Sequence, residues 1–407
     1  MRENLEIQEL KEQILRDIDL SRDVEDEEIK ELIRKRCGKY AKEHMLSLRT
    51  RGEMEQILFH ALRKLDVLQE LLDDDEITEI MVNGPGHIFY EKAGRLYEYE
   101  KAFVSKERLE DIIQQIAGSN NRIINLSNPI VDTRLADGSR VNIVLAPISI
   151  EGPAISIRKF PKRPYEMRDL VQMEAISEEA AKFLENLVLA RYNIFVSGGT
   201  GSGKTTFLNA LSQFIPREER IITIEDSAEL QLIDKPNLVR LETRNSNTEG
   251  VTPISIRDLI KAALRMRPSM IVVGECRGGE ALDVLQAMNT GHDGSLSTGH
   301  ANSCKDMVAR LETMVLMGSV ELPVAAIRSQ IASGIDVFVH LGRLRDKSRK
   351  VLSITEVSGY ENGEILFNEI YRFREFEERG GHIRGELVKV GELQHKEKII
   401  NAGITRL

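Results

Sequence analysis

A glycine-rich segment near the middle of the chain has the residue types and the spacing of a phosphate-binding loop. Gly198, Gly203, Lys204 and Thr205 satisfy the pattern G-x-x-x-x-G-K-[ST], directly after the apolar run NIFVS. Glycines let backbone N–H groups surround phosphate oxygens without clashes from Cβ atoms, at the positive end of the following helix. Lys204 is expected to neutralise the β- and γ-phosphates, and the hydroxyl of Thr205 to hold Mg²⁺. The residues predicted to contact the nucleotide are Gly198, Gly199, Thr200, Gly201, Ser202, Gly203, Lys204, Thr205 and Thr206.

Two acidic strand ends are candidates for the carboxylates that such a loop needs. RIITIED ends in Glu225 and Asp226, and MIVVGE ends in Glu275. The second run has the hydrophobic character of a Walker B strand, but Gly274 stands where many phosphate-loop proteins have an aspartate. Glu275 is therefore expected to serve either the hydrated Mg²⁺ or the attacking water. A single carboxylate at a strand end is usually only solvated, whereas two in one sheet favour function. The sequence leaves open whether Glu225 or Glu275 positions the water.

The segment GHDGSLSTGHANS, residues 291–303, contains two of the eight histidines. If GSLST is a strand, a rise of about 3.3 Å per residue places His292 and His300 about 26 Å apart. Two ligands of one zinc ion lie only about 4 Å apart through the metal, so a shared metal site is not expected. Ligands of open α/β sheets bind at the carboxyl ends of strands. We therefore predict that His300 contacts or senses the γ-phosphate and that His292 is structural, with a functional role for His292 as the alternative. For Thr298, a buried strand position is favoured over a role in orienting water.

The elements that would hold these residues form an α/β pattern in the second half of the chain. Apolar runs alternate with helical patterns, which predicts a parallel sheet covered by helices on both faces. Ser177 is a candidate cap for the helix that follows it. Asn362-Gly363 is a two-residue hairpin signal near the C-terminus, and strands there would extend the edge of the sheet. The predicted strand runs are NIFVS, RIITIED, LVRLE, MIVVGE, GSLST and DVFVHL.

The first part of the chain predicts two further regions. Apolar residues at helical spacing indicate a helical bundle over residues 1–65, with a docking arm for a partner as the alternative. Residues 66–158 predict an α+β domain, with a hairpin around Ala93-Gly94. Prolines among basic residues indicate a linker over 159–175. The α/β region is then expected to occupy residues 176–407.

Composition excludes several classes of protein. The chain carries a net charge of −9 and no tryptophan, which argues against a general nucleic-acid binder with basic and stacking surfaces. Three widely spaced cysteines without a C-x-x-C argue against a disulfide framework and against a cysteine-based zinc site. No run of about 18 apolar residues and no signal peptide is found, so we expect a cytoplasmic location.

These motifs together resemble a known family. The phosphate loop, TIED, VGE followed by Arg277, and the histidine segment occur in the order found in the type II/type IV secretion and pilus-assembly ATPases. The segments MVNGPG, VDTRLADGSRVN, SIRKF, RNSNTEG, LRMRPS and AMNTGHDGSLSTGHANS look more narrowly like the tight-adherence pilus motors, often called CpaF-like. The resemblance covers about residues 66–345.

The resemblance implies a hexameric ring of ATP- and Mg²⁺-dependent motor subunits. Each subunit would have a PAS-like α+β domain hinged to a RecA-like ATPase domain, and would work at the inner face of the membrane on a pilus or secretion platform. The family's Asp box falls on Glu225 and Asp226, its Walker B glutamate on Glu275, and its His box on residues 291–303. Its phosphate-sensing arginines match Arg134 and Arg140, with Arg158 as a further candidate.

The sequence departs from the family pattern in two places, and three alternative functions are weighed against the pilus motor. Ser269 replaces an aspartate that relatives usually have, and the tetracysteine zinc module of the type II secretion relatives is missing.

A type IV secretion or conjugation ATPase that exports effectors or DNA would share the same fold and chemistry. A RecA-like nucleic-acid motor would share the phosphate loop, but the acidic charge speaks against it. A regulatory module that binds nucleotide without hydrolysis is disfavoured, because Lys204, Thr205, Glu225 and Glu275 are all present.

Overall fold

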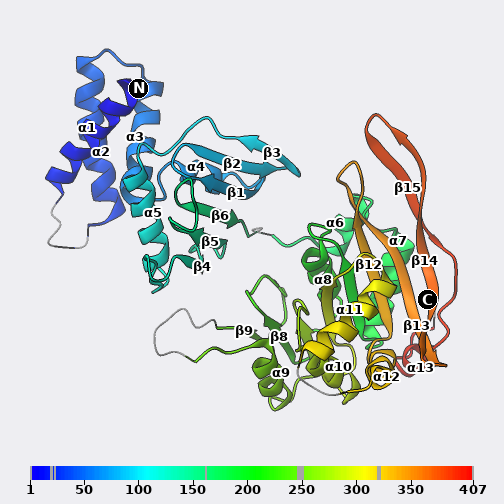
Figure 1. Cartoon of the computed structure of the whole chain (residues 1–407). Helices are drawn as coiled ribbons and strands as arrows, with labels where there is room; N and C mark the ends of the chain where they lie inside the picture. Colours follow the sequence, from blue (N-terminus) through cyan, green and yellow to red (C-terminus); the bar gives the residue numbers. More distant parts are fainter. Residues whose placement is uncertain are drawn as a thin grey trace. The chain divides into compact units, whose positions relative to one another are not determined.

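The computed structural model describes residues 2–18, 22, 24–160, 163–244, 252–318 and 322–405. The chain divides into two compact units, and the second begins at Arg163 (Figure 1). Each unit has hydrophobic cores of its own. Most of the RNSNTEG segment, from residue 245 onward, and residues 161 and 162 of the predicted linker lie outside the described residues. Within the described ranges, no helix is both long enough and apolar enough to cross a membrane.

The N-terminal unit begins with a small bundle of three helices. Ile14, Ile33 and Leu58, one from each helix, are fully buried in a shared core, as the helical spacing predicts. Ser47 caps the third helix by accepting a hydrogen bond from the backbone N–H of Thr50. The helices are α1 (Arg2–Asp17), α2 (Asp26–Glu43) and α3 (Leu48–Arg63).

An antiparallel sheet of six strands forms the rest of this unit, in the order β3-β2-β1-β6-β5-β4. Ala93 and Gly94 have positive φ in the turn between β2 and β3, which confirms the predicted hairpin. The buried residues of α5 and of the inward-facing strand positions share one core. The elements are α4 (Leu68–Asp73), β1 (Ile77–Asn83), β2 (His87–Lys92), β3 (Arg95–Glu98), α5 (Lys106–Gly118), β4 (Ile130–Arg134), β5 (Arg140–Val144) and β6 (Ala154–Arg158).

The C-terminal unit contains a sheet of nine strands in the order β15-β14-β13-β12-β7-β11-β10-β8-β9. The strands from β12 to β9 pair in parallel, which confirms the predicted α/β fold. All six predicted runs form strands: β7 (Ile194–Gly198), β8 (Ile221–Glu225), β9 (Leu238–Glu242), β10 (Met270–Val273), β11 (Leu296–His300) and β12 (Val337–Arg343). The parallel arrangement brings the carboxyl ends of β7, β11, β10 and β8 to one edge of the sheet.

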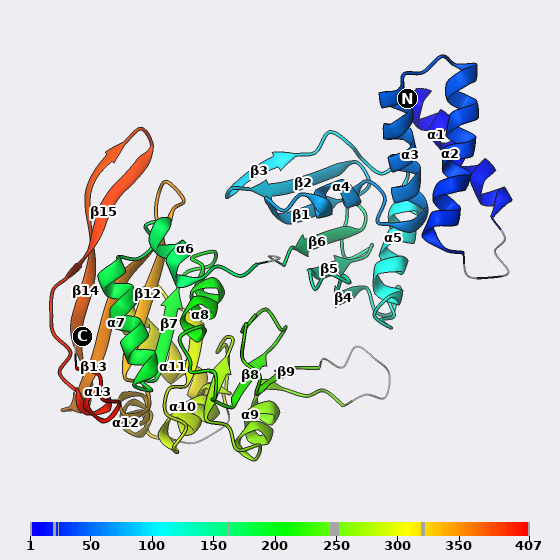
Figure 2. The same ribbon diagram turned by 180° about the vertical axis from the view of Figure 1, so that it is seen from behind.

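Helices cover both faces of this sheet. Met270 and Val272 point into one core while Ile271 and Val273 point into the other, because successive side chains of a strand alternate. The first core receives α6 (Met167–Gln172), α7 (Glu178–Leu189) and α8 (Lys204–Ser212), which lie in front in Figure 2. The second receives α9 (Ile256–Leu264), α10 (Ala281–Asn289), α11 (Cys304–Met317) and α12 (Val324–Gly334), which lie in front in Figure 1.

Three antiparallel strands extend the sheet, as predicted. They are β13 (Arg349–Glu361), β14 (Glu364–Arg379) and β15 (His382–Lys389), and the short helix α13 (Glu397–Asn401) follows them. Asn362 and Gly363 both have positive φ in the turn between β13 and β14. Part of the segment predicted as a linker, 159–175, is folded, because α6 begins at Met167 and buries this side chain in the core of the C-terminal unit.

Candidate functional site

The predicted phosphate loop connects the end of β7 to the start of α8. Gly198 is the last residue of β7, and Gly203 adopts a left-handed φ of 91° immediately before the first residue of α8, Lys204. A Cβ atom at Gly198 would lie 2.6 Å from the carbonyl oxygen of Leu341 and equally close to the hydroxyl of Ser202. Only glycine fits at this position, so the loop depends on the residue types from which it was predicted.

Lys204 and His300 are brought together at the mouth of the loop. The Lys204 ammonium is buried and donates hydrogen bonds to the carbonyl oxygens of Gly198, at 3.2 Å, and Gly199, at 3.0 Å. His300 is the last residue of the neighbouring strand β11, and its Nδ1 lies 3.2 Å from the Lys204 Nζ. Burial lowers the pKa of His300, and the Lys204 charge lowers it further, against an opposing effect of Glu275. The imidazole is therefore neutral and accepts from the ammonium.

Glu275 completes a cluster of charged groups on the next strand end. Its Oε1 lies 2.8 Å from Nε2 of His300, although this oxygen is buried and not aligned with any donor of the described residues for a hydrogen bond. Its Oε2 is held by Arg277, whose Nη2 lies 2.6 Å away. Arg277 also approaches Asp226, with 3.7 Å between Nη1 and Oδ2. One carboxylate oxygen of Glu275 is thus fixed and the other faces His300.

Glu225 lies one strand further along, at the end of β8, and is buried with only 3% of its surface exposed. Its Oε1 accepts hydrogen bonds from the backbone N–H groups of Glu229 and Leu230, at 2.8 and 2.9 Å. Burial raises the pKa of Glu225 to about 7, against the lowering effect of these hydrogen bonds. A Cβ atom at Gly274 would lie 2.9 Å from Cγ of Glu225. The glycine that replaces the usual Walker B aspartate is therefore what makes room for Glu225.

Two other residues of the histidine segment have structural contacts. Thr298 is buried and donates to the carbonyl oxygen of Gly274 at 2.8 Å, so its hydroxyl links β11 to the end of β10. His292 precedes β11, at the end of the strand opposite to His300, and its carbonyl oxygen accepts from the hydroxyl of Ser295 at 2.7 Å. Nδ1 of His292 is buried without a hydrogen-bond partner among the described residues.

The three arginines predicted in the N-terminal unit lie next to one another. Arg134 ends β4 and is paired in register with Arg140, the first residue of β5. Arg140 is paired in turn with Arg158, the last residue of β6. The Nε of Arg158 lies 3.8 Å from Oε1 of Glu79 on β1. Antiparallel pairing therefore collects these side chains, 24 positions apart in the sequence, at one edge of a single sheet.

Two arginines that the motif analysis missed lie beside the phosphate loop. Arg343 and Arg349 are paired in register where β12 passes into β13. Nε of Arg349 donates to the carbonyl oxygen of Gly201 at 2.9 Å, and Nη1 of Arg343 lies 3.6 Å from the position of a Cβ built on Gly201. The sequence signal was weak, because GRLRDKSRK reads as an ordinary basic turn until the neighbouring strand of the sheet is known.

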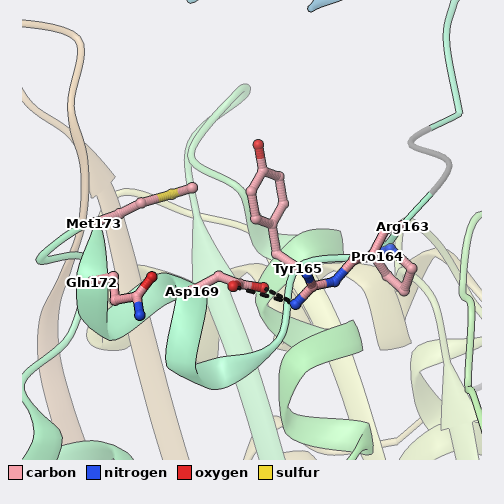
Figure 3. A pocket seen from close by; sticks show the side chains of 6 residues that line it. All are labelled: Arg163, Pro164, Tyr165, Asp169, Gln172 and Met173. Atoms are coloured by element: carbon pink, nitrogen blue, oxygen red, sulfur yellow. Dashed lines mark hydrogen bonds and ion pairs between the residues drawn. The ribbon is translucent and has the colours of Figure 1, made fainter. Parts of the chain in front are cut away.

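An open pocket of about 240 Å³ lies at the start of the C-terminal unit (Figure 3). The Tyr165 ring stands on one side of it, and the Met173 and Gln172 side chains extend from the end of α6. Arg163 crosses its floor to Asp169, with 3.3 Å between Nη2 and Oδ2. An aromatic face, a thioether and an amide are groups that pack against and hydrogen-bond a planar polar ring. The pocket is lined by Arg163, Pro164, Tyr165, Asp169, Gln172 and Met173.

Four strand ends thus place complementary chemistry around the loop. A buried ammonium and the backbone N–H groups that begin α8 favour an anion with several charges. The neutral imidazole of His300 lies next to the ammonium, and the Glu275 oxygen that Arg277 does not hold lies next to the imidazole. Such a set suits phosphoryl transfer, in which positioning and electrostatic stabilisation supply most of the rate.

Comparison with known proteins places the chain among secretion proteins. A family model described as "Type II/IV secretion system protein" matches residues 61–375. A putative conjugal transfer protein of Mycobacterium tuberculosis is 34% identical over 305 residues, which cover 74% of this chain and 86% of that protein. The type IV secretion system protein VirB11 of Brucella suis is 35% identical over 305 residues, which cover 68% of this chain and 84% of VirB11.

Solved structures share the fold. The Legionella pneumophila ATPase DotB is 22% identical with a TM-score of 0.52, over 72% of this chain and 80% of DotB. The pilus retraction motor PilT with bound ADP is 19% identical with a TM-score of 0.51, over 84% of this chain and 87% of PilT. The family match extends from the end of α3 into β14 and includes the whole charged cluster around the phosphate loop, so the chain belongs to the type II/IV secretion system protein family.

Proposed function

We propose that this protein is an ATP-hydrolysing motor of a pilus-assembly or secretion system. One observation carries the proposal: Lys204 of the phosphate loop, His300 of β11 and Glu275 after β10 converge at one edge of the sheet. The family match and the shared fold of the DotB ATPase agree with it. A regulatory module that does not hydrolyse nucleotide would not need the Glu275 carboxylate beside His300.

Each residue of the cluster has a defined task in this proposal. Lys204 binds the β- and γ-phosphates, and the loop N–H groups bind the remaining oxygens. The unengaged oxygen of Glu275 orients the attacking water, while Arg277 holds the other oxygen in place. His300 contacts the γ-phosphate as a neutral donor or acceptor. Glu225 supports the site from within the sheet, because its Oε1 is already occupied by backbone N–H groups.

The residues present fit a magnesium–nucleotide complex. The buried Lys204 ammonium donates to carbonyl oxygens of its own loop, and phosphate oxygens would take the place of these acceptors. Thr205, in the first turn of α8, is half-buried and would present its hydroxyl to the metal ion, and Glu275 would reach the ion through its hydration shell. Bound Mg²⁺ supplies neutralisation of the phosphate charge that develops during transfer.

Arginines of the N-terminal unit are proposed to complete the site. Arg134, Arg140 and Arg158 lie at one sheet edge, where several guanidinium groups act together on one anion. This arrangement and the family resemblance support a hexameric ring in which movement of the N-terminal unit accompanies hydrolysis. We further propose a cytoplasmic location with peripheral association to the inner membrane face, through platform proteins, with no nucleic-acid ligand and no zinc.

A pilus motor and a secretion or conjugation ATPase remain two forms of this proposal. The segments RLADGSR and AMNTGHDGS resemble the tight-adherence pilus motors, and we propose that form first. The conjugal transfer protein and VirB11 among the matched relatives favour the second form. Deletion in the native host distinguishes them: loss of surface fibres in electron micrographs supports the pilus motor, and loss of DNA transfer or effector export with intact fibres supports the alternative.

The decisive experiment is the steady-state ATPase rate per mole of subunit over a range of protein concentrations. We expect the specific rate to rise with concentration, and Lys204→Ala and Glu275→Gln to abolish it. Arg140→Ala should reduce it strongly, whereas the matched surface variant Arg95→Ala, on the same sheet, should not. Normal turnover by Glu275→Gln would overturn the role given to that residue. Stimulation by single-stranded DNA at a stated salt concentration would instead favour a nucleic-acid motor.

A further inference from the structure

The hairpin of β12 and β13 contacts the phosphate loop, and the roles proposed for Lys204, Glu275 and His300 do not explain this contact. The hairpin starts from β12, which pairs in parallel with β7 and places Leu341 opposite Gly198. Arg349 then donates from Nε to the carbonyl oxygen of Gly201, and its Cδ lies 3.4 Å from the position of a Cβ built on Gly203. Arg349 thus hydrogen-bonds Gly201 and occupies the space beside Gly203 into which a side chain would extend.

The position of Arg349 is set by strand pairing and by fixed contacts on both sides. The next residue, Lys350, donates from Nζ to the carbonyl oxygen of Glu174 at 2.7 Å, and the backbone N–H of Val351 donates to Ala175 at 2.8 Å. In the turn of the hairpin, Asp346 accepts from both the N–H and the hydroxyl of Ser348. The backbone of Arg349 is therefore held rigidly, and only its own side chain reaches out to the loop.

The charge balance around this arginine favours an anion nearby. Both Arg343 and Arg349 are exposed, and they are paired side by side in the ladder. Among the described residues, no carboxylate forms an ion pair with Arg349. By contrast Arg345, in the same turn, pairs with Glu375 and Glu378 on β14. A guanidinium group without a carboxylate partner is stabilised by a nearby anion or dipole, and the carbonyl oxygen of Gly201 supplies such a dipole to Arg349.

We propose that Arg349 is a positioning residue of the phosphate loop, and that Arg343 adds positive charge beside it. Glycines lose more conformational freedom on ordering than other residues, so a loop with four glycines is costly to order around a ligand. A hydrogen bond that holds Gly201 in advance reduces this cost and tightens binding of the phosphates. The inference rests on the proposed nucleotide-binding function. It adds Arg349 to the residues that serve this function, and Arg349 belongs neither to the loop nor to the strand-end carboxylates and His300.

The test is a titration of the full chain with MANT-labelled ADP and Mg²⁺, together with ATPase kinetics. Arg349→Ala should weaken ADP binding about tenfold and raise KM for ATP by a similar factor, with kcat changed less than about twofold. Arg349→Lys keeps the charge and a donor and should recover most of the affinity. Arg343→Ala should weaken binding by less than Arg349→Ala. Arg345→Ala, the matched loss of an arginine from the same turn, should leave binding unchanged.

The outcomes separate this inference from the function on which it rests. Saturable ADP binding by the wild type, lost in Lys204→Ala, establishes the nucleotide site. Wild-type affinity and KM in Arg349→Ala would then overturn the positioning role alone. A fall in kcat with no change in KM would also contradict it, because a preordered loop acts on binding. If the wild type itself does not bind ADP, the proposed function fails. Unchanged thermal unfolding of Arg349→Ala excludes a general loss of structure as the cause.

Discussion

At the scale of single residues, the site depends on where charges are buried. Lys204 is buried beside neutral partners, whereas Glu275 is fixed by Arg277 and Glu225 by backbone N–H groups. Burial lowers the pKa of His300 and raises the pKa of Glu225 to about 7, because both charged forms lose solvation. Loss of solvation therefore makes His300 a neutral base and lets Glu225 titrate near neutral pH.

Replacement of Glu225 by glutamine tests that titration. The pKa of this carboxyl rises from 4.5 to about 7 in the folded chain, so its ionised form is disfavoured there. Wild-type stability should fall as the pH rises from about 5 through 7, by at most about 3 kcal/mol, relative to Glu225→Gln. Urea unfolding at a series of pH values measures the difference. Glu242→Gln, at the exposed register partner on β9, retains the Glu225 carboxyl and should keep the wild-type trend. A difference independent of pH would contradict the assignment.

The close packing of Gly274 against Glu225 predicts coupling between the two positions. A Cβ at residue 274 would lie 2.9 Å from Cγ of Glu225, so Gly274→Ala should cost about 1–3 kcal/mol. In a Glu225→Ala background, the colliding atom is absent and the cost should largely disappear. A double-mutant cycle of unfolding free energies checks this. Additive effects of the two changes would show that the side chains do not share this space.

At the scale of elements, the C-terminal strands are held to the α/β core by buried polar contacts. Glu356 of β13 is 1% exposed, and its carboxylate accepts from the backbone N–H groups of Gln394 and His395 and from the amide of Asn368. The segment that follows β15 has no ladder of its own, and Leu393 is buried in the core. This carboxylate is therefore a buried anchor for the residues that follow β15, alongside the hydrogen bond from Tyr192 to the carbonyl oxygen of His395.

Removal of this carboxylate should release the tail. Glu356→Ala leaves the backbone N–H groups of Gln394 and His395 without an acceptor and removes one of the two acceptors of the Asn368 amide, which should cost about 2–4 kcal/mol. Limited proteolysis followed by mass spectrometry should then show cleavage between residues 389 and 397 before the rest of the chain is cut. Glu361→Ala, on the same strand but exposed, provides the control. Equal protection of both variants would show that apolar packing alone holds the tail.

At the scale of the whole molecule, the chain consists of two units with separate cores. The phosphate loop, both candidate glutamates and His300 belong to the C-terminal unit, whereas Arg134, Arg140 and Arg158 belong to the N-terminal one. Binding and hydrolysis are therefore separable in principle. The proposed motor requires that the N-terminal arginines contribute to hydrolysis more than to binding, since they act on the charge of the transition state.

Expression of residues 163–407 alone tests this division. The fragment should unfold cooperatively, because both of its cores are complete, and it should bind ADP with nearly the affinity of the full chain. Its ATPase rate should be lower by at least about 100-fold, since arginines that stabilise the transferred phosphoryl group contribute 10³–10⁵ in related systems. Circular dichroism, ADP titration and turnover measure the three properties. Full activity of the fragment would remove the N-terminal arginines from the mechanism.

Short-range sequence patterns were sufficient to predict much of the secondary structure and the phosphate loop. The phosphate loop, the six parallel strands, the hairpins at Ala93-Gly94 and Asn362-Gly363 and the cap at Ser177 follow from short-range spacing, because turn chemistry and side-chain periodicity act over a few residues. His300 was placed at the correct end of its strand by the same reasoning. The sequence by itself therefore determined the elements and the form of the loop that we propose binds phosphate.

Only the tertiary structure decided which distant residues meet. Strand order and register bring Arg134, Arg140 and Arg158 to one edge, place Glu225 in the space left by Gly274, and set Arg349 against Gly201. None of these pairs is close in sequence, and no local pattern encodes the register between strands. The folded sheet selects such contacts because one residue of slip would move every side chain to the opposite face, so burial of the two cores fixes the partners.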